Sequence, residues 1–578
     1  MANTEIVEYL RTRRYNAANL RRGGPPASAP VKKPGQIIKG FIAVGIVVSA
    51  FVIDILIKHN WGVEHAISSG LFFGFVLTAG FMILAKNDGM KIFQGIGSIF
   101  SLGAGSSPGN LKTFADDPKS LPFSLWLGES TGWLSQKYHG TGIAAGQQVA
   151  LSLPDACQNI LVLGGIGSGK TTRAMHPLLL QLLDQKCGGL IFDIKGDFID
   201  AVGTFADAVD RPVKVIGVDA LPINLLKGLT PEVASSFLKS IFMLSGHFHT
   251  DPFWIETATE LCRNTLGVLS FVPQYYSLNG LYLYLFDEQV KLEIIDKVTA
   301  IAAYLDDRNK RLLRSYSGYK EKVFDPFDDK VKAGVNATIA QVLSPFNHPD
   351  LVDAFCTESP DNVAMEDVLN GAVYLVELPL SKWGLGGKVV YSMIKLRFFN
   401  VMQDRNQHPD WNQDRPVFFM CDEFQELVSA NKDGLSDLNF WDKARSSKTI
   451  GIISGQAISS FDAAIGNRDI ARALLQNFRQ KISFKTEDTS TLQYFNSLAD
   501  KVEVERKSYS STSGRSSGSW KNGDSSHNSN TENVSIVDKP VIDAQLFRTM
   551  HPEQLLALLT IGGHSMDDVL NTYTIYVE

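Results

Sequence analysis

The chain reads Gly164-Gly-Ile-Gly-Ser-Gly-Lys-Thr171 directly after the apolar run 159–163, and this stretch matches the pattern GxxxxGK[ST]. Between a strand and a helix the pattern cradles phosphate, because the glycines let the backbone curl and the N–H groups face the anion. We expect Lys170 to reach the β- and γ-phosphates of ATP, and the Thr171 hydroxyl to bind Mg²⁺. The alternative is a glycine-rich turn without a ligand. The predicted nucleotide-binding residues are Gly164, Gly165, Ile166, Gly167, Ser168, Gly169, Lys170, Thr171 and Thr172.

A second motif supplies two acids. The apolar run 417–421 predicts a buried strand, and Asp422 and Glu423 follow it. We expect Asp422 to bind Mg²⁺ together with Thr171, and Glu423 to activate the water that attacks the γ-phosphate. Two adjacent acids at the end of a buried strand are costly unless a metal or a water uses them. An ordinary strand end at the surface is therefore the less favoured interpretation, and hydrolysis is favoured over nucleotide binding alone.

Other apolar runs indicate the rest of the core. Short runs that read as parallel strands occur at 189–194, 213–218, 372–378, 450–454 and 481–484. Helical stretches alternate with them, which predicts a doubly wound α/β sheet. The segment 225–345 shows helical periodicity without a strand series. It predicts an all-α domain inserted into the sheet domain.

A basic turn and a strand follow the second motif. Gln456 stands at the carboxyl end of the predicted strand 450–454, where it could sense the γ-phosphate or align water. Arg445 precedes that strand and could act as an arginine finger on a neighbouring subunit's nucleotide. From its position alone, an ordinary surface salt bridge is an equal alternative for Arg445.

The N-terminal region predicts a membrane anchor. Of 578 residues, 44% are hydrophobic and 20% charged, and the net charge is −6, yet segment 1–36 is basic. Two apolar runs, 40–57 and 66–85, are long enough to cross a bilayer as a hairpin within 37–86. Flanking Lys and Arg place both ends in the cytoplasm. The alternative is a buried helical hairpin of a soluble domain.

Five cysteines without a CxxC pair indicate neither a zinc ribbon nor a disulfide framework.

Two further stretches have open interpretations. The stretch 508–530 is rich in Ser, Gly and Asn and is expected to be a flexible loop between two strands. The stretch 308–322 combines six Lys and Arg residues with Tyr316 and Tyr319. Cations with interleaved aromatics can bind phosphates and stack bases, but a solvated loop is at least as good an interpretation.

The ordered set of motifs resembles the type IV secretion coupling proteins, the membrane-anchored ATPases of conjugative DNA transfer. Beside the hairpin, the two nucleotide motifs, Arg445 and Gln456, the resemblance rests on these stretches: Asp193-Ile-Lys-Gly-Asp197, Leu221-Pro-Ile-Asn-Leu-Leu226, Asp251-Pro-Phe-Trp254, Leu343-Ser-Pro-Phe346, Ile542-Asp-Ala-Gln-Leu-Phe-Arg548 and Pro552-Glu-Gln-Leu-Leu556. It covers nearly the whole chain. The chain departs from the family at Asp197, where Glu is common, and at Leu225, where Pro is common.

The resemblance implies a RecA-like domain at 87–224 and 346–578, with the all-α domain at 225–345. It implies a homo-hexameric ring in the bacterial inner membrane, with Arg445 as the arginine finger acting between subunits. The implied partners are a relaxase or relaxosome, single-stranded DNA and the components of a secretion channel.

Two alternative functions remain at this point. One is a receptor for effector proteins that does not pump DNA, which the acidic body permits. The other is a chromosome-type translocase of double-stranded DNA, which usually carries a C-terminal winged DNA reader that we do not find before Glu578.

Overall fold

The structure is a computed structural model, which describes residues 123–137, 143–245, 252–359, 362–430, 434–499, 501–516 and 525–576. The basic segment 1–36 and the predicted hairpin 37–86 lie outside these residues. Within the described ranges, no helix has the length and the apolar composition needed to cross a bilayer.

Eleven strands form one sheet in the order β2-β1-β15-β12-β9-β3-β8-β7-β4-β6-β5. The seven strands from β9 to β5 are parallel, and the other four add an antiparallel extension beyond β9. The strands are β1 Leu125–Ser130, β2 Gln148–Leu151, β3 Ile160–Leu163, β4 Gly188–Asp193, β5 Lys214–Gly217, β6 Val373–Glu377, β7 Val417–Cys421, β8 Thr449–Gly455, β9 Gln480–Ser483, β12 Gln554–Leu558 and β15 Asp568–Asn571. Two short strands, β13 Thr560–Ile561 and β14 His564–Ser565, pair separately.

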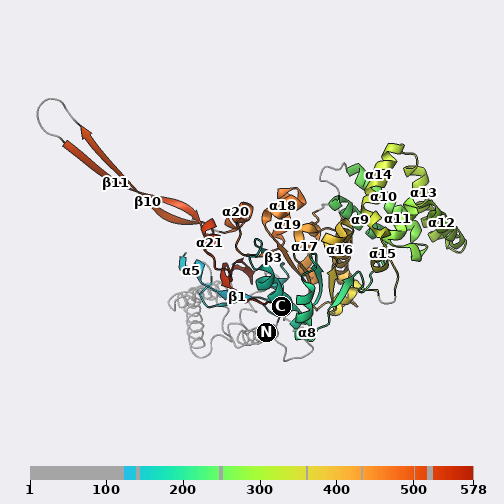
Figure 1. Cartoon of the computed structure of the whole chain (residues 1–578), viewed down its shortest axis with the longest axis horizontal. Coiled ribbons are helices and arrows are strands. Elements are labelled where there is room, and N and C mark those ends of the chain that lie inside the picture. The colour runs from blue at the N-terminus through green and yellow to red at the C-terminus, as the bar shows by residue number, and fades with distance from the viewer. Residues whose placement is uncertain are drawn as a thin grey trace, which may run out of the picture. The chain divides into compact units, whose positions relative to one another are not determined.

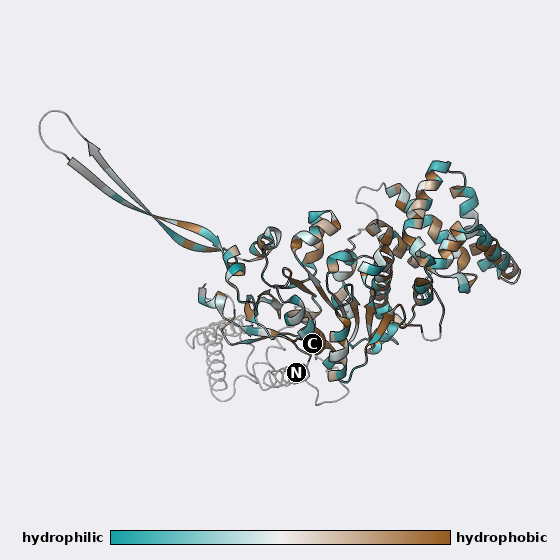
Figure 2. Ribbon diagram, viewed as in Figure 1, coloured by the Kyte–Doolittle hydropathy of each residue, from teal (hydrophilic) through white to brown (hydrophobic). Residues whose placement is uncertain are grey.

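The predicted α/β sheet is confirmed. Each of the five apolar runs expected as strands lies in the parallel part, as β4, β5, β6, β8 and β9. Apart from the edge strand β5, the parallel strands are buried on both faces, which explains why they read as continuous apolar runs. In β3, Leu161 and Leu163 join one hydrophobic cluster, and Ile160 and Val162 join the other. Figure 2 shows these central strands as strongly hydrophobic.

Helices cover both faces of the sheet. α7 and α8 supply apolar residues to the cluster that contains Ile160, whereas α16, α17 and α19 supply the cluster that contains Leu161. The elements around the sheet are α5 Trp133–Lys137, α6 Leu153–Ala156, η1 Thr171–Met175, α7 His176–Asp184, α8 Ile199–Ala208, α16 Leu380–Asp404, η6 Arg405–Gln407, η7 Phe424–Glu426, α17 Asp437–Trp441, η8 Ala444–Ser447, α18 Ile458–Ile465, α19 Arg468–Gln476, α20 Thr489–Leu498 and α21 Ala544–Thr549.

Between β5 and β6 the described chain is helical, and Figure 1 shows these helices gathered beside the sheet. Several begin at a side chain that accepts a backbone N–H bond, namely Ser277, Asp287, Asp306 and Asp328, which stabilises each helix start. The elements are α9 Pro231–Ser245, α10 Pro252–Leu269, η2 Pro273–Tyr275, α11 Leu278–Phe286, α12 Glu288–Ala302, α13 Asp307–Tyr319, η3 Lys320–Phe324, α14 Asp329–Leu343, η4 Ser344–Asn347, α15 Pro349–Phe355 and η5 Met365–Asn370.

The basic stretch 308–322 is helical, so the solvated loop, one of the two interpretations left open for it, is wrong. Tyr316 is 7% exposed, and its hydroxyl donates to Glu232 at 2.9 Å. Its ring packs so closely on Gly267 that an added Cβ would lie 2.2 Å from it. Stacking of a base on Tyr316 is therefore ruled out, because the ring is part of the helical core.

The Ser-rich stretch also differs from expectation. Strands β10 Lys501–Ser516 and β11 Ser525–Pro540 pair in unbroken antiparallel register, so most of 508–530 is strand, and residues 517–524 lie outside the description. Figure 1 shows the two strands as a ribbon that extends beyond the sheet. Ser and Asn give no alternating hydrophobic signal, and the backbone ladder forms without one.

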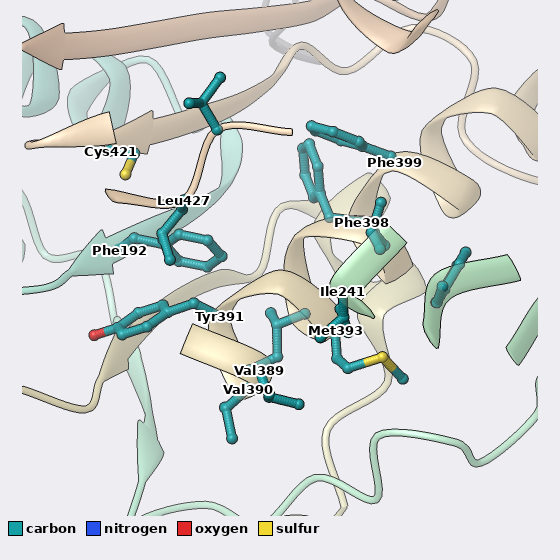
Figure 3. Packing of buried hydrophobic residues seen from close by; sticks show 14 of the residues in the cluster. Phe192, Ile241, Val389, Val390, Tyr391, Met393, Phe398, Phe399, Cys421 and Leu427 are labelled. Carbon is teal, nitrogen blue, oxygen red and sulfur yellow. The ribbon is translucent and has the colours of Figure 1, made fainter. Parts of the chain in front are cut away.

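Helix α16 contributes many of the buried apolar residues on one face of the sheet. Val389, Val390, Tyr391 and Met393 are buried in this core, and the ring of Tyr391 lies 4.9 Å from that of Phe192 (Figure 3). In the same core Lys395 is fully buried and donates to the Asp437 carboxylate at 2.6 Å. That carboxylate also accepts from the backbone and hydroxyl of Ser429, at 2.7 and 2.9 Å. The pair thereby fixes the chain that follows Asp422 and Glu423.

We predict that Lys395→Met lowers the free energy of unfolding by about 3–5 kcal/mol, because it leaves the Asp437 carboxylate buried without its cation. Denaturant unfolding followed by Trp fluorescence measures the change. The matched control is Lys388→Met, which removes an ion pair to Glu426 of 2.9 Å whose side chains are 45% and 44% exposed. That variant should lose at most about 1 kcal/mol. Equal stability of the two variants would contradict the structural role of the buried pair.

Candidate nucleotide-binding site

The glycine-rich loop leaves the carboxyl end of β3 and enters the π-helical turn η1, which continues as α7. Gly167 and Gly169 have φ of 70° and 92°, left-handed values that glycine adopts without strain. At Gly164 an added Cβ would lie 2.8 Å from the Phe484 Cβ, so only glycine fits there. The Ser168 hydroxyl is buried without a hydrogen-bond partner among the described residues. A glycine-lined turn with an unsatisfied hydroxyl fits a phosphate ligand.

The side chain of Lys170 folds onto the glycine-rich loop that it belongs to. Its ammonium donates to the carbonyl oxygens of Gly164 at 2.6 Å and Gly165 at 3.4 Å, and the side chain is buried. Burial lowers the pKa of Lys170, and the charges of Asp422 and Glu423 oppose that shift. The ammonium is therefore within electrostatic range of both acids. A triphosphate would offer it anionic oxygens in place of two neutral carbonyls.

The start of α7 is held by the far end of the described chain. In η1 the Thr172 carbonyl accepts a hydrogen bond from the Ile575 N–H at 2.9 Å. The Arg173 side chain donates to the Thr574 hydroxyl at 3.0 Å, and His176 Nδ1 lies 3.1 Å from the Ile575 carbonyl oxygen. These hydrogen bonds from residues 574 and 575 fix the position of the turn that contains Thr171 and Thr172. The sequence pattern gave no sign of this contact.

The acid pair stands at the carboxyl end of β7, separated from β3 by β8 alone. Asp422 accepts a hydrogen bond from the Ser454 hydroxyl of β8. Glu423 takes left-handed backbone angles, with φ of 52°, which turn its side chain out of the strand direction. The hydroxyl of Thr171 and the carboxylate of Asp422 are oxygen ligands of the kind that Mg²⁺ prefers.

The carboxylate of Glu423 contacts three donor side chains. Its Oε1 pairs with Lys195 Nζ at 2.5 Å, and its Oε2 accepts from Gln425 Nε2 at 2.5 Å and from Gln456 Nε2 at 3.4 Å. Burial alone would raise the pKa of Glu423, but these bonds, above all that to Lys195, hold the pKa below its usual value with help from the charge of Lys170. Glu423 is therefore ionised at neutral pH.

Most of the expected site residues converge. The structure places Lys170, Thr171, Asp422, Glu423 and Gln456 at the carboxyl edge of neighbouring parallel strands, where ligands of open α/β sheets bind.

Arg445 lies apart from that group. It is exposed in η8, which precedes the first residue of β8, so it stands at the opposite edge of the sheet from the loop of its own subunit. The length of β8, about 3.3 Å for each residue, separates the two edges. Arg445 therefore cannot reach the glycine-rich loop of the same chain.

Sequence reasoning missed Lys195, Gln425 and Ser454 as members of the site. Lys195 follows the end of β4, and β4 pairs with β7, so a polar residue just beyond that strand end was a candidate once the strand order was known. Gln425 and Ser454 carry no motif of their own. Their role follows from contacts that only the folded chain makes.

A cavity of about 510 Å³ lies next to the two glutamines. Gln425 and Gln456 line it together with residues of α9, α16 and α18, and none of its lining residues belongs to the glycine-rich loop. The cavity and the phosphate-binding loop are therefore separate features.

Two family models match the sequence. The model of the type IV secretion-system coupling protein DNA-binding domain matches residues 146–270, and that of the TraM recognition site of TraD and TraG matches 416–552. The first range contains the glycine-rich loop, and the second contains the acid pair and the β10–β11 ribbon. No curated protein matches the sequence.

Solved structures share the fold. The bacterial conjugative coupling protein TrwBdeltaN70, in an unbound form, is 15% identical with a TM-score of 0.51, over 80% of this chain and 95% of that chain. The plasmid coupling protein TrwB in complex with ADP and Mg²⁺ is 14% identical with a TM-score of 0.52, over 80% and 96%. The α/β fold expected from the motifs, for which the family resemblance implied a RecA-like P-loop domain, is thus shared with these proteins. The two matched models and the shared fold support a type IV secretion coupling protein.

Proposed function

We propose that the chain hydrolyses ATP. The observation that carries the proposal is the convergence of Lys170, Asp422 and Glu423 at one edge of the parallel sheet. The solved TrwB structures hold ADP with Mg²⁺ or non-hydrolysable analogues of ATP and GTP, which supports the same ligand class here.

Each group of the site has a defined task in this proposal. The backbone of 164–172 binds the triphosphate, and Lys170 exchanges its loop carbonyls for phosphate oxygens. Glu423 accepts a proton from the attacking water, which Gln456 helps to align. Mg²⁺, held by Thr171 and Asp422, would neutralise charge that develops on the β- and γ-phosphate oxygens.

We further propose that ATP hydrolysis drives substrate transfer at a membrane. In this proposal the chain is a homo-hexamer anchored in the bacterial inner membrane by 37–86, with the sheet domain in the cytoplasm. It recruits relaxase-bound single-stranded DNA and delivers it to a secretion channel. The matched DNA-binding and TraM-recognition models support nucleic acid and relaxosome proteins as partners. Reporter fusions after Lys33 and within 59–64 would test the anchor, since the hairpin places them on opposite sides of the membrane.

A receptor for effector proteins is the second candidate, and the net charge of −6 favours it over a generally cationic DNA-binding protein. Binding of the purified full-length chain to single-stranded DNA across a salt series separates the two. DNA transfer predicts an affinity that falls with a log–log slope of about −0.7 for each phosphate contacted. Failure to bind at about 50 mM salt would favour the effector receptor. A clear preference for duplex DNA would instead favour a double-strand translocase.

We predict that Glu423→Gln slows ATP hydrolysis by about 10²- to 10⁴-fold while ATP still binds, because an amide cannot accept the proton of the attacking water. Steady-state hydrolysis and equilibrium binding of a fluorescent ATP analogue measure the two effects. Lys170→Ala serves as the comparison and should lose hydrolysis together with most of the binding. A Glu423→Gln variant with the parent's rate would transfer the role of base to another group.

We predict that Arg445 acts on the nucleotide of a neighbouring subunit, because it lies at the sheet edge opposite its own site. Lys170→Ala and Arg445→Ala should then be separately inactive, and mixed rings should recover part of the activity. Recovery is expected because some interfaces pair an intact loop with an intact arginine. The loss in Arg445→Ala should be large, as arginine fingers contribute about 10³- to 10⁵-fold.

Native mass spectrometry must first show that mixed rings form. Mixed rings without recovered activity would contradict this role of Arg445, and so would an Arg445→Ala variant as active as the parent. Arg445 would then be an ordinary surface cation.

A further inference from the structure

Arg405 is a buried cation whose guanidinium binds three separate pieces of backbone. Its side chain belongs to η6, directly after α16, and the residue is 1% exposed. Nε donates to the carbonyl oxygen of Asn412 at 2.7 Å, Nη2 to that of Arg415 at 2.8 Å, and Nη1 to that of Ser447 at 2.7 Å. Burial lowers the pKa of Arg405 to about 10, so the guanidinium stays charged at neutral pH and its hydrogen bonds are charge-assisted.

The bond to Ser447 fixes the turn η8, which carries Arg445. Ser447 is the last residue of that turn and is buried. Its hydroxyl donates to the carbonyl oxygen of Ala444 at 3.0 Å and lies 2.8 Å from the hydroxyl of Thr449. The next residue, Lys448, has a left-handed φ of 55°, and its N–H donates to the carbonyl oxygen of Arg445 at 3.2 Å. The backbone of the turn is thus held from the interior, while the side chain of Arg445 is exposed.

The loop 412–415 joins the same turn to the start of β7. Lys448 Nζ pairs with the Asp414 carboxylate at 2.9 Å, and the Val417 N–H donates to the Lys448 carbonyl oxygen at 3.2 Å. Arg405 therefore lies where the loop, the start of β7 and η8 meet, at the edge of the sheet opposite the glycine-rich loop. Loss of its guanidinium leaves carbonyl oxygens of the loop and of η8 without their donor, which favours a shift of these segments.

We propose that Arg405 is a positioning residue that holds Arg445 in place for the nucleotide of a neighbouring subunit. The inference rests on the proposed function and adds the residue that sets the position of the arginine finger. Phosphoryl transfer is sensitive to that position, since a displacement of about 1 Å can lower a rate about 10²-fold. Lysine cannot replace Arg405, because the donors of an ammonium lie on one nitrogen, whereas those of a guanidinium form a fixed planar fork.

The first test compares Arg405→Lys with Arg397→Lys in the purified full-length chain. Arg397 is the matched control, because its buried guanidinium also donates to backbone carbonyls, those of Leu225 at 3.1 Å and Lys227 at 2.7 Å, away from η8. Arg405→Lys should lower kcat for ATP hydrolysis about 10²-fold, through displacement of the finger. Equilibrium binding of a fluorescent ATP analogue should stay at the parent's value, because the subunit's own site is intact. Arg397→Lys should keep the parent's kcat.

Mixed rings, shown to form by native mass spectrometry, separate a displaced finger from a damaged nucleotide site. Rings of Arg405→Lys and Lys170→Ala subunits should recover part of the activity, because some interfaces pair an intact loop with a correctly held Arg445. Rings of Arg405→Lys and Arg445→Ala subunits should recover none, since every interface lacks a correctly held arginine. Any other pattern overturns the proposal, and the reverse pattern assigns Arg405 to the nucleotide site of its own subunit.

Lys448 provides a second test that leaves the buried guanidinium unchanged. Its φ of 55° suits glycine and strains a β-branched side chain. Lys448→Val and Lys448→Gly both remove the ion pair to Asp414, but only valine strains the turn. Lys448→Val should therefore have a kcat at least about tenfold below that of Lys448→Gly. Equal kcat values would show that the position of the turn does not matter, and would overturn the proposal even if Arg405→Lys failed to fold.

The outcomes distinguish this inference from the proposed function. A parent chain without ATP hydrolysis refutes the proposed function itself. A parent that hydrolyses ATP beside an equally active Arg445→Ala variant refutes the arginine finger and the positioning role with it. An inactive Arg445→Ala variant beside an Arg405→Lys variant with the parent's kcat refutes the positioning role alone.

Discussion

The parallel register of β3, β8 and β7 is the constraint on which the rest of the molecule depends. Leu163 pairs with Gly455, and Cys421 pairs with Ile453, so the phosphate-binding loop and the acid pair leave the sheet within two rungs of each other on β8. Parallel strands all end at one edge, so two motifs far apart in sequence meet there. The same register sends the residues before β8 to the other edge. One hydrogen-bond ladder thus explains why Gln456 lies in the site and Arg445 does not.

The electrostatics of the site describe a resting state. Lys170 donates to loop carbonyls, Asp422 accepts from Ser454, and Glu423 pairs with Lys195, so each charged group has an internal partner. These partners stabilise the charges without a nucleotide, since buried charges are costly when unpaired. In the proposed function, ATP and Mg²⁺ replace these partners when they bind.

The sequence predicted the elements whose signal is local. The glycine-rich loop, the acid pair and the buried strands could be read because each depends on consecutive residues with a known chemistry. The ribbon β10–β11 could not, since Ser and Asn residues show no strand periodicity and the pairing arises from the backbone. Tyr316 was equally unreadable, because the same aromatic can stack a base or fill a core. Lys195 became visible only when the strand order placed β4 beside β7.

The most direct test of the account is a structure of the full-length chain with Mg²⁺ and a non-hydrolysable ATP analogue. The account predicts the triphosphate in the loop 164–172, with the Lys170 ammonium moved from the Gly164 carbonyl to phosphate oxygens. It also predicts Mg²⁺ between the Thr171 hydroxyl and the Asp422 carboxylate. A nucleotide in the cavity beside α9, α16 and α18, or a Lys170 that still donates to Gly164 with nucleotide bound, would contradict it.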